Sequence, residues 1–146
     1  MTEQDWQARW YIYRFFIDQE RPPTFEELAS HFGIAPVEAR DIFYRLNAAH
    51  AVLLDGDRVR MAHPLSAVPT DYRVQVEHRR YWANCAWDSL GIAAMLNADA
   101  DIEAQLPLSG EIIHCRVRHG TLEAAPGYLV HFSLPVRNWY DDLVHT

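Results

Sequence analysis

Cys85 and Asp88 are the two residues whose types and spacing are best suited to chemistry. They lie in the aromatic-rich stretch Tyr81–Ile92. Apolar residues at helical spacing, with no internal proline, predict a helix over Ala86–Leu96 that begins just after the cysteine and carries the aspartate on the same face. Free N–H groups at a helix N-terminus favour a thiolate, whereas a nearby carboxylate favours the thiol and tends to hold a proton. The pair therefore combines a soft nucleophile with a carboxyl proton carrier.

Plainer interpretations of the same residues stay open at this point. A free cysteine is most often a small buried apolar residue, and an acid in a first helical turn satisfies free N–H groups. A Cys-His hydrolase would use Cys85 as its nucleophile, but nothing in the spacing selects a base among the eight histidines.

A second group of residues suggests a metal site by type alone: His114, Cys115, His119 and His131. On a strand, Cys115 and His119 would share a face but lie roughly 13 Å apart, too far to ligate one ion. The sequence contains no Cys-x-x-Cys or His-x-x-x-His pair. Hydrogen-bonding histidines and a buried Cys115 are the simpler interpretation, and these patterns predict no resident metal.

The N-terminal part of the chain predicts three helices and a hairpin. The first helix covers about residues 4–19, a capping box at Thr24–Glu27 begins a second that extends through Phe32, and a third covers Pro36–His50. The turn Asp55–Asp57 contains an Asp-Gly pair between two apolar runs, which predicts a hairpin. We therefore expect a winged-helix-like domain over residues 1–63.

Winged-helix units often bind DNA, but the charges of this one argue against it. The candidate recognition helix balances Glu38 and Asp41 against Arg40 and Arg45, so its formal charge is zero. A DNA-reading helix usually presents a basic face. Nucleic acid is therefore not an expected partner.

The remaining residues, 64–146, predict a small mixed β-sheet domain around the central helix. We expect strands over Tyr72–Val76, Glu111–Arg118 and Tyr128–Leu134, a turn at 78–80, an irregular link over Asn97–Leu108 and a short helix over Val136–Leu143. The fold class is α+β.

Composition limits the size of the core, the partners and the cellular location of the protein. With 146 residues, 49% of them hydrophobic, the chain can bury one core, as one domain or as two small domains that share an interface. The net charge of −7 disfavours non-specific attraction to nucleic acid or an acidic membrane, and no apolar run approaches the ~20 residues that span a bilayer. Two cysteines and no secretory pattern at the N-terminus favour a cytoplasmic protein.

Several stretches resemble the organomercurial lyase (alkylmercury lyase) family. They are Pro64–Thr70, Tyr72–Val74, Tyr81–Ile92, Ser109–Glu111, His131–Phe132 and Trp139–Asp142. The Asn-Cys-x-x-Asp block with its flanks is the most specific of them, and the helical N-terminal unit is similar to the winged-helix-like domain of that family. The resemblance covers most of the chain.

The resemblance implies protonolysis of a carbon–mercury bond, which gives a hydrocarbon and Hg(II) without an organic cofactor. Cys85 matches the cysteine whose thiolate binds mercury, and Asp88 matches the aspartate that handles the proton, so both contact the substrate or product metal. The family also has a second mercury-binding cysteine beyond the Trp139–Asp142 region, and this chain has none there. We therefore expect capture by one thiolate and impaired turnover. The alternative is a non-catalytic relative that binds soft metals or acts as a winged-helix DNA-binding regulator.

Overall fold

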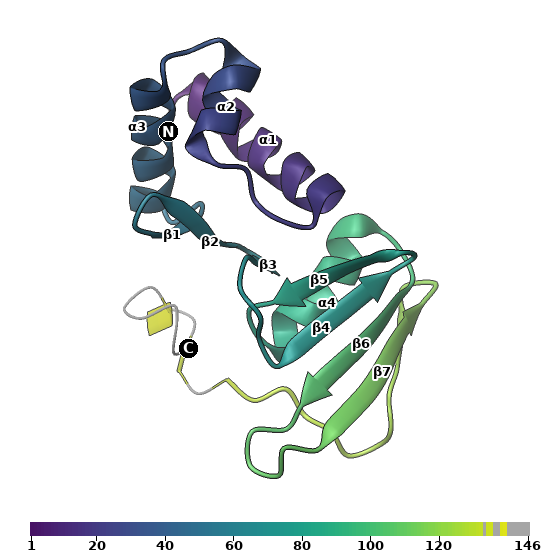
Figure 1. The fold of residues 1–146 in the computed structure, drawn as a ribbon. Coiled ribbons are helices and arrows are strands. Elements are labelled where there is room, and N and C mark those ends of the chain that lie inside the picture. The colour runs from purple at the N-terminus through teal and green to yellow at the C-terminus, as the bar shows by residue number, and fades with distance from the viewer. Residues whose placement is uncertain (133, 136–137, 140–146) are drawn as a thin grey trace.

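The computed structural model describes residues 1–132, 134–135 and 138–139, which form four helices and eight strands (Figure 1). The helices are α1 (Glu3–Gln19), α2 (Phe25–Phe32), α3 (Pro36–Ala48) and α4 (Ala86–Leu96). The strands are β1 (Leu53–Asp55), β2 (Arg58–Ala62), β3 (Leu65–Ser66), β4 (Tyr72–Val76), β5 (Arg79–Ala83), β6 (Ala100–Gln105), β7 (Ile112–Arg118) and β8 (Thr121–Glu123). The predicted α+β class is confirmed.

The strands form one continuous antiparallel sheet in the order β1-β2-β3-β5-β4-β6-β7-β8. The expectation of a mixed sheet was wrong, because every pairing among the described strands is antiparallel. Short turns join most neighbours, and antiparallel strands need no long crossover. The pairing of β2 with β3 continues the sheet across residues 63 and 64, where we expect the domain boundary. The division into 1–63 and 64–146 stays a prediction.

The three N-terminal helices follow their capping signals. Thr24 accepts a hydrogen bond from the backbone N–H of Glu27, and Gly33 ends α2 in the left-handed conformation with φ of 64°. The third helix begins at Pro36, as predicted, but ends at Ala48, two residues before the predicted end. The winged-helix description of this unit stays a prediction.

Three expectations about the C-terminal part were wrong. The segment Asn97–Leu108, expected to be an irregular link, contains β6. The turn predicted at 78–80 ends before Arg79, where β5 begins. Residues 128–132 form no strand, and β8 was not anticipated. Most of the short helix predicted over Val136–Leu143 lies outside the described residues.

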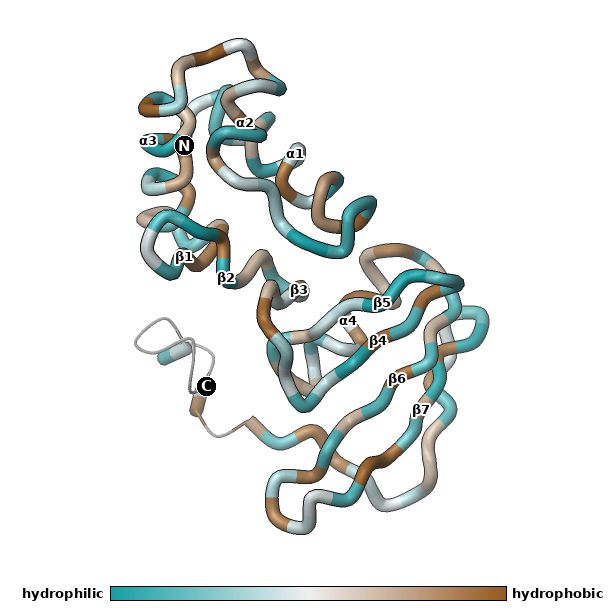
Figure 2. The backbone as a smooth tube through the Cα atoms, viewed as in Figure 1, coloured by the Kyte–Doolittle hydropathy of each residue, from teal (hydrophilic) through white to brown (hydrophobic). Residues whose placement is uncertain are grey.

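Helix α4 packs on one face of the sheet, against β4, β5 and β6 (Figure 1). Its buried Ile92 belongs to one contiguous core that also contains Ile102 of β6, Leu65 of β3, and Phe16 and Phe43 of the helical unit. This packing fixes the N-terminus of α4 relative to the strands that surround it. Hydrophobic and hydrophilic residues are interleaved along the helices and strands (Figure 2). Among the described residues, no helix has the length and hydropathy needed to cross a membrane.

Candidate functional site

The candidate site lies at the turn between β5 and α4. Strand β5 ends at the buried Ala83, and α4 begins at Ala86, so Asn84 and Cys85 form the connection. Cys85 is the N-cap residue of α4, with an extended backbone, but its side chain makes no capping hydrogen bond. Because β5 and α4 are both packed into the core, the thiol and the first helical turn are held in a fixed relation.

A cavity of about 430 Å³ opens beside this turn. Its walls come from the start of α4, from β4, β6, β7 and β8, and from the segment that follows β8. The polar and sulfur-bearing residues along it include His63, Asn84, Cys85, Asp88, Cys115 and His131. Much of the remaining wall is apolar and includes Ile102, Leu106, Ile113, Leu122, Leu129 and Val130. A cavity with an apolar wall and a few polar groups is the usual form of a small-molecule site.

Burial raises the pKa of the Cys85 thiol above its ordinary value, and the neighbouring Asp88 carboxylate raises it further. The backbone N–H groups of Asp88 and Trp87 act in the opposite direction but do not outweigh burial. The helix N-terminus alone would favour a thiolate, so desolvation decides the outcome. These effects favour the thiol at neutral pH, and its proton must leave before the sulfur can bind a metal ion.

Asp88 is in the first turn of α4, and its side chain is only 16% exposed. The carboxylate oxygen Oδ2 accepts a hydrogen bond from Nδ2 of Asn84 at 3.0 Å and lies 3.5 Å from Nδ1 of His63. The carboxylate also lies close enough to Cys85 to affect the pKa of its thiol. A thiol and a carboxyl group are thus adjacent at the edge of one cavity.

Comparison with known proteins identifies the family of this chain. The model of the alkylmercury lyase family, MerB, matches residues 65–146, which is more than half of the chain. The chain belongs to the alkylmercury lyase family. The resemblance seen in the sequence is confirmed, and the matched span includes both Cys85 and Asp88.

A solved structure has the same fold. The chain is similar to the protein described as "Crystal structure of the mercury-bound form of MerB2", with a TM-score of 0.70 and 24% sequence identity. The similarity covers 86% of this chain and 62% of that one, so this alkylmercury lyase family member spans less than two thirds of the related chain. No curated protein matches the sequence.

The residues of the second sequence cluster have separate positions in this lyase-family fold. Cys115 and His131 line the cavity, whereas His114 is largely exposed beside Glu103, and the backbone N–H of His119 donates to Asp99 at a distant turn. No group of three or more His, Cys, Asp or Glu residues within the described parts of the chain could hold a metal ion. Cys115 is partly buried, as part of β7, and burial alone raises the pKa of its thiol.

Sequence reasoning missed two residues that contact Asp88. Asn84 was part of the Asn-Cys-x-x-Asp block, but no role was assigned to it; its position directly before the first turn of α4 is a signal that could have identified the contact. His63 lies 25 positions before Asp88, in the turn between β2 and β3, and no spacing rule connects them. The antiparallel pairing of β3 with β5 brings the two segments together.

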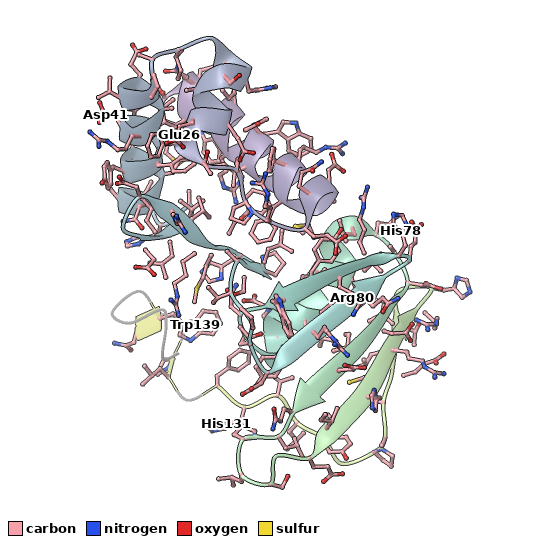
Figure 3. All side chains as sticks on the ribbon, in the orientation of Figure 1. Glu26, Asp41, His78, Arg80, His131 and Trp139 are labelled. Atoms are coloured by element: carbon pink, nitrogen blue, oxygen red, sulfur yellow. The ribbon has the colours of Figure 1, made fainter. Side chains whose placement is uncertain are left out.

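Aromatic side chains lie at the edge of the cavity. Phe132 packs edge-on against Trp87 of α4, with ring centroids 5.9 Å apart, and stacks on Trp139 at 5.4 Å. Figure 3 shows His131 and Trp139 on the segment that follows the sheet.

Proposed function

We propose that this protein is an organomercurial lyase that cleaves carbon–mercury bonds by protonolysis. The observation that carries the proposal is the pairing of the Cys85 thiol with the Asp88 carboxylate at the edge of an apolar cavity. A thiol is a soft ligand suited to a soft metal, and a carboxyl group beside it can move a proton. The membership of the chain in the alkylmercury lyase family supports the same chemistry.

The proposed reaction begins when the organomercury cation binds sulfur. The mercury–sulfur bond of Cys85 forms as the S–H bond breaks, and the thiol proton passes to Asp88. The carboxylic acid then donates that proton to the carbon attached to mercury. The electron pair of the carbon–mercury bond becomes the new carbon–hydrogen bond, so a hydrocarbon leaves and Hg(II) stays on the sulfur. No oxidation or reduction occurs, and Asp88 returns to its starting state.

The cavity would hold the organic group of the substrate. Its apolar wall suits an alkyl or aryl group, because burying such a surface is favourable. The proposed partners are therefore an organomercury compound as substrate and Hg(II) as product. The chemistry uses only the side chains of this chain and the substrate metal.

The test uses phenylmercury and a thiol buffer. We expect the purified wild-type protein to release benzene, measured by gas chromatography, and to form a phenylmercury adduct on Cys85 that is visible by mass spectrometry. Cys85→Ser should abolish both, since a hydroxyl is a poor ligand for mercury. Cys115→Ser is the matched variant, because it changes the other cysteine of the same cavity in the same way.

Three outcomes would contradict the proposal. Wild-type protein that forms the adduct but releases no benzene would be the non-catalytic, metal-binding relative. Equal benzene release from wild type and from Cys85→Ser would remove this thiol from the reaction. Loss of the adduct in Cys115→Ser but not in Cys85→Ser would show that Cys115 of β7 binds the mercury instead of Cys85.

A further inference from the structure

The Asp88 carboxyl group is held through one of its two oxygens. Asn84 donates to Oδ2 at 3.0 Å, and His63 Nδ1 lies 3.5 Å from the same oxygen. Asn84 Nδ2 is also 3.3 Å from His63 Nδ1. The three side chains therefore form a compact cluster in which Asn84 makes the shortest contacts. The other carboxylate oxygen, Oδ1, takes part in none of these contacts.

The Asn84 amide is placed to bridge its two neighbours. An amide nitrogen carries two hydrogens, and one can be donated to Asp88 Oδ2 while the other is donated to an unprotonated His63 Nδ1; the Leu65 carbonyl, at 3.5 Å, is the most distant of the three acceptors of this nitrogen. The amide oxygen Oδ1 of Asn84 is buried and has no hydrogen-bond partner in the described part of the chain. A buried unpaired carbonyl is unfavourable, so this orientation requires the hydrogen bonds of the nitrogen to outweigh that cost.

His63 is itself fixed from two directions. Its backbone carbonyl accepts a hydrogen bond from the Tyr13 hydroxyl of α1 at 2.7 Å. On the other side, Pro64 packs against α4 at Gly91, where an added Cβ would lie 3.3 Å from Cβ of Pro64. Gly91 is three residues after Asp88 and allows this close approach. The backbone of the turn is therefore held next to the first turns of α4.

We propose that Asn84 and His63 are positioning residues for the proton transfer, an inference that rests on the proposed lyase function. His63 orients the Asn84 amide, and that amide holds Oδ2 of Asp88. Oδ1 is then left to accept the thiol proton of Cys85 and to donate it to the substrate carbon. The O–H bond on Oδ1 breaks as the carbon–hydrogen bond forms, while Oδ2 keeps its hydrogen bond throughout.

The test separates capture from protonolysis in single turnovers with phenylmercury. Asn84→Ala and His63→Ala should still form the Cys85 adduct, slowed less than benzene release, because the thiol proton can also pass to the buffer whereas the proton on the substrate carbon must come from Asp88. Their benzene release should slow by about ten- to 100-fold, since a displaced reacting group costs factors of this size. His63→Asn, which places an amide oxygen near the position of Nδ1, should restore most of the rate.

The matched control is His78→Asn, the same substitution at a largely exposed histidine in the turn between β4 and β5 (Figure 3). It should release benzene at the wild-type rate. Equal release from wild type, His63→Ala and Asn84→Ala would overturn the positioning roles and leave the lyase proposal intact. A wild type that releases no benzene would overturn both. Equal slowing of adduct formation and benzene release, without rescue by His63→Asn, would show a structural role only.

A second measurement on the wild-type protein needs no variant to fold. Nitrogen-15 NMR of labelled histidine should show His63 as the neutral tautomer with its proton on Nε2, because Nδ1 accepts from Asn84. A proton on Nδ1 would mean that His63 donates directly to Asp88, and it would overturn the bridging role of Asn84.

Discussion

The four helices each carry an acidic residue at the third helical position, but they use it in two ways. In the N-terminal unit, the carboxylates of Asp5, Glu27 and Glu38 accept the backbone N–H of the residue that caps their own helix. These hydrogen bonds measure 2.7, 2.8 and 3.0 Å. In α4 the capping residue is Cys85, and Asp88 instead contacts Asn84 and His63.

Under the proposed function, helix capping and proton transfer would compete for the same carboxylate. A capping box satisfies free N–H groups and stabilises a helix. At α4 that stabilisation is absent, and the packing of Ile92 against the sheet keeps the helix in place instead. Under the proposed function, the site that holds the Cys85 thiol lacks this local stabilisation of the helix and relies on tertiary packing.

The substitution with the largest expected effect is Asp88→Asn. The amide has the same shape but cannot donate a carboxylic proton to carbon, so benzene release should fall by roughly 10²- to 10⁴-fold. Adduct formation on Cys85 should persist. Single-turnover gas chromatography and mass spectrometry check both steps. Benzene release at the wild-type rate would show that Asp88 is a helix-capping acid like the other three.

The same variant should change how capture depends on pH. Burial raises the pKa of the Cys85 thiol, so the thiolate fraction at neutral pH is small and grows as the pH rises. In Asp88→Asn, with no adjacent proton acceptor, the rate of adduct formation should rise with pH in step with the thiolate fraction of Cys85. The wild type should show a flatter profile because Asp88 accepts the thiol proton. Stopped-flow measurements that give equally steep slopes would contradict this.

Asp5→Asn tests an acid at the same helical position that caps its own helix. Burial acts to raise the pKa of Asp5, but hydrogen bonds from Arg45 and Thr2 outweigh it and hold the pKa below its usual value. The ionised carboxylate therefore stabilises the fold above the unfolded pKa, and this stability is lost as the pH falls through the folded pKa.

The substitution should lower the free energy of unfolding at pH 7 by about 2 kcal/mol, a modest value because Arg45 keeps 45% of its side chain in water. Urea unfolding at pH 7 and at pH 3 measures it, and the difference between the two proteins should shrink at the lower pH. Benzene release per folded molecule should not change. A loss of benzene release per folded molecule in Asp5→Asn would contradict the distinction between the helix-capping carboxylates and Asp88.

The smallest expected effect is a gain in stability from Cys85→Ser. Serine is a good N-cap and cysteine makes no capping hydrogen bond here, so the variant should unfold with a free energy higher by about 0.5–1 kcal/mol. Cys115→Ser is the control, because its residue lies within a strand and caps no helix. Equal thermal stability of Cys85→Ser and wild type would mean that the geometry of this turn does not admit a capping serine.

The sequence predicted the elements that carry strong local signals. Capping residues and prolines identified the N-terminal helices, and the Asp-Gly pair identified the hairpin. Strand β6 was missed although Asp101 and Glu103 alternate with buried residues, because two of those buried residues are alanines with little hydrophobic signal. Alanine suits this strand, since α4 packs directly on it.

Other failures have their cause in tertiary structure. The apolar residues of Tyr128–Leu134 predicted a strand, but several of them line the cavity instead, and Leu129 is 93% exposed. The edge beside β7 is taken by the three-residue strand β8. The Cys85–Asp88 pair was readable because both residues belong to one helical turn. His63 was not, because only the pairing of β3 with β5 brings it to the site.

The hydrogen bond from Tyr13 to the carbonyl of His63 has a consequence for how such proteins can be recombined. The span that matches the family begins at residue 65 and thus contains the thiol and the acid, but neither His63 nor α1. A chimera that joined residues 65–146 to the helices of another relative would inherit the reacting groups without this anchor. We expect such an exchange to preserve mercury capture and to weaken protonolysis unless a hydroxyl equivalent to that of Tyr13 came with the new helices.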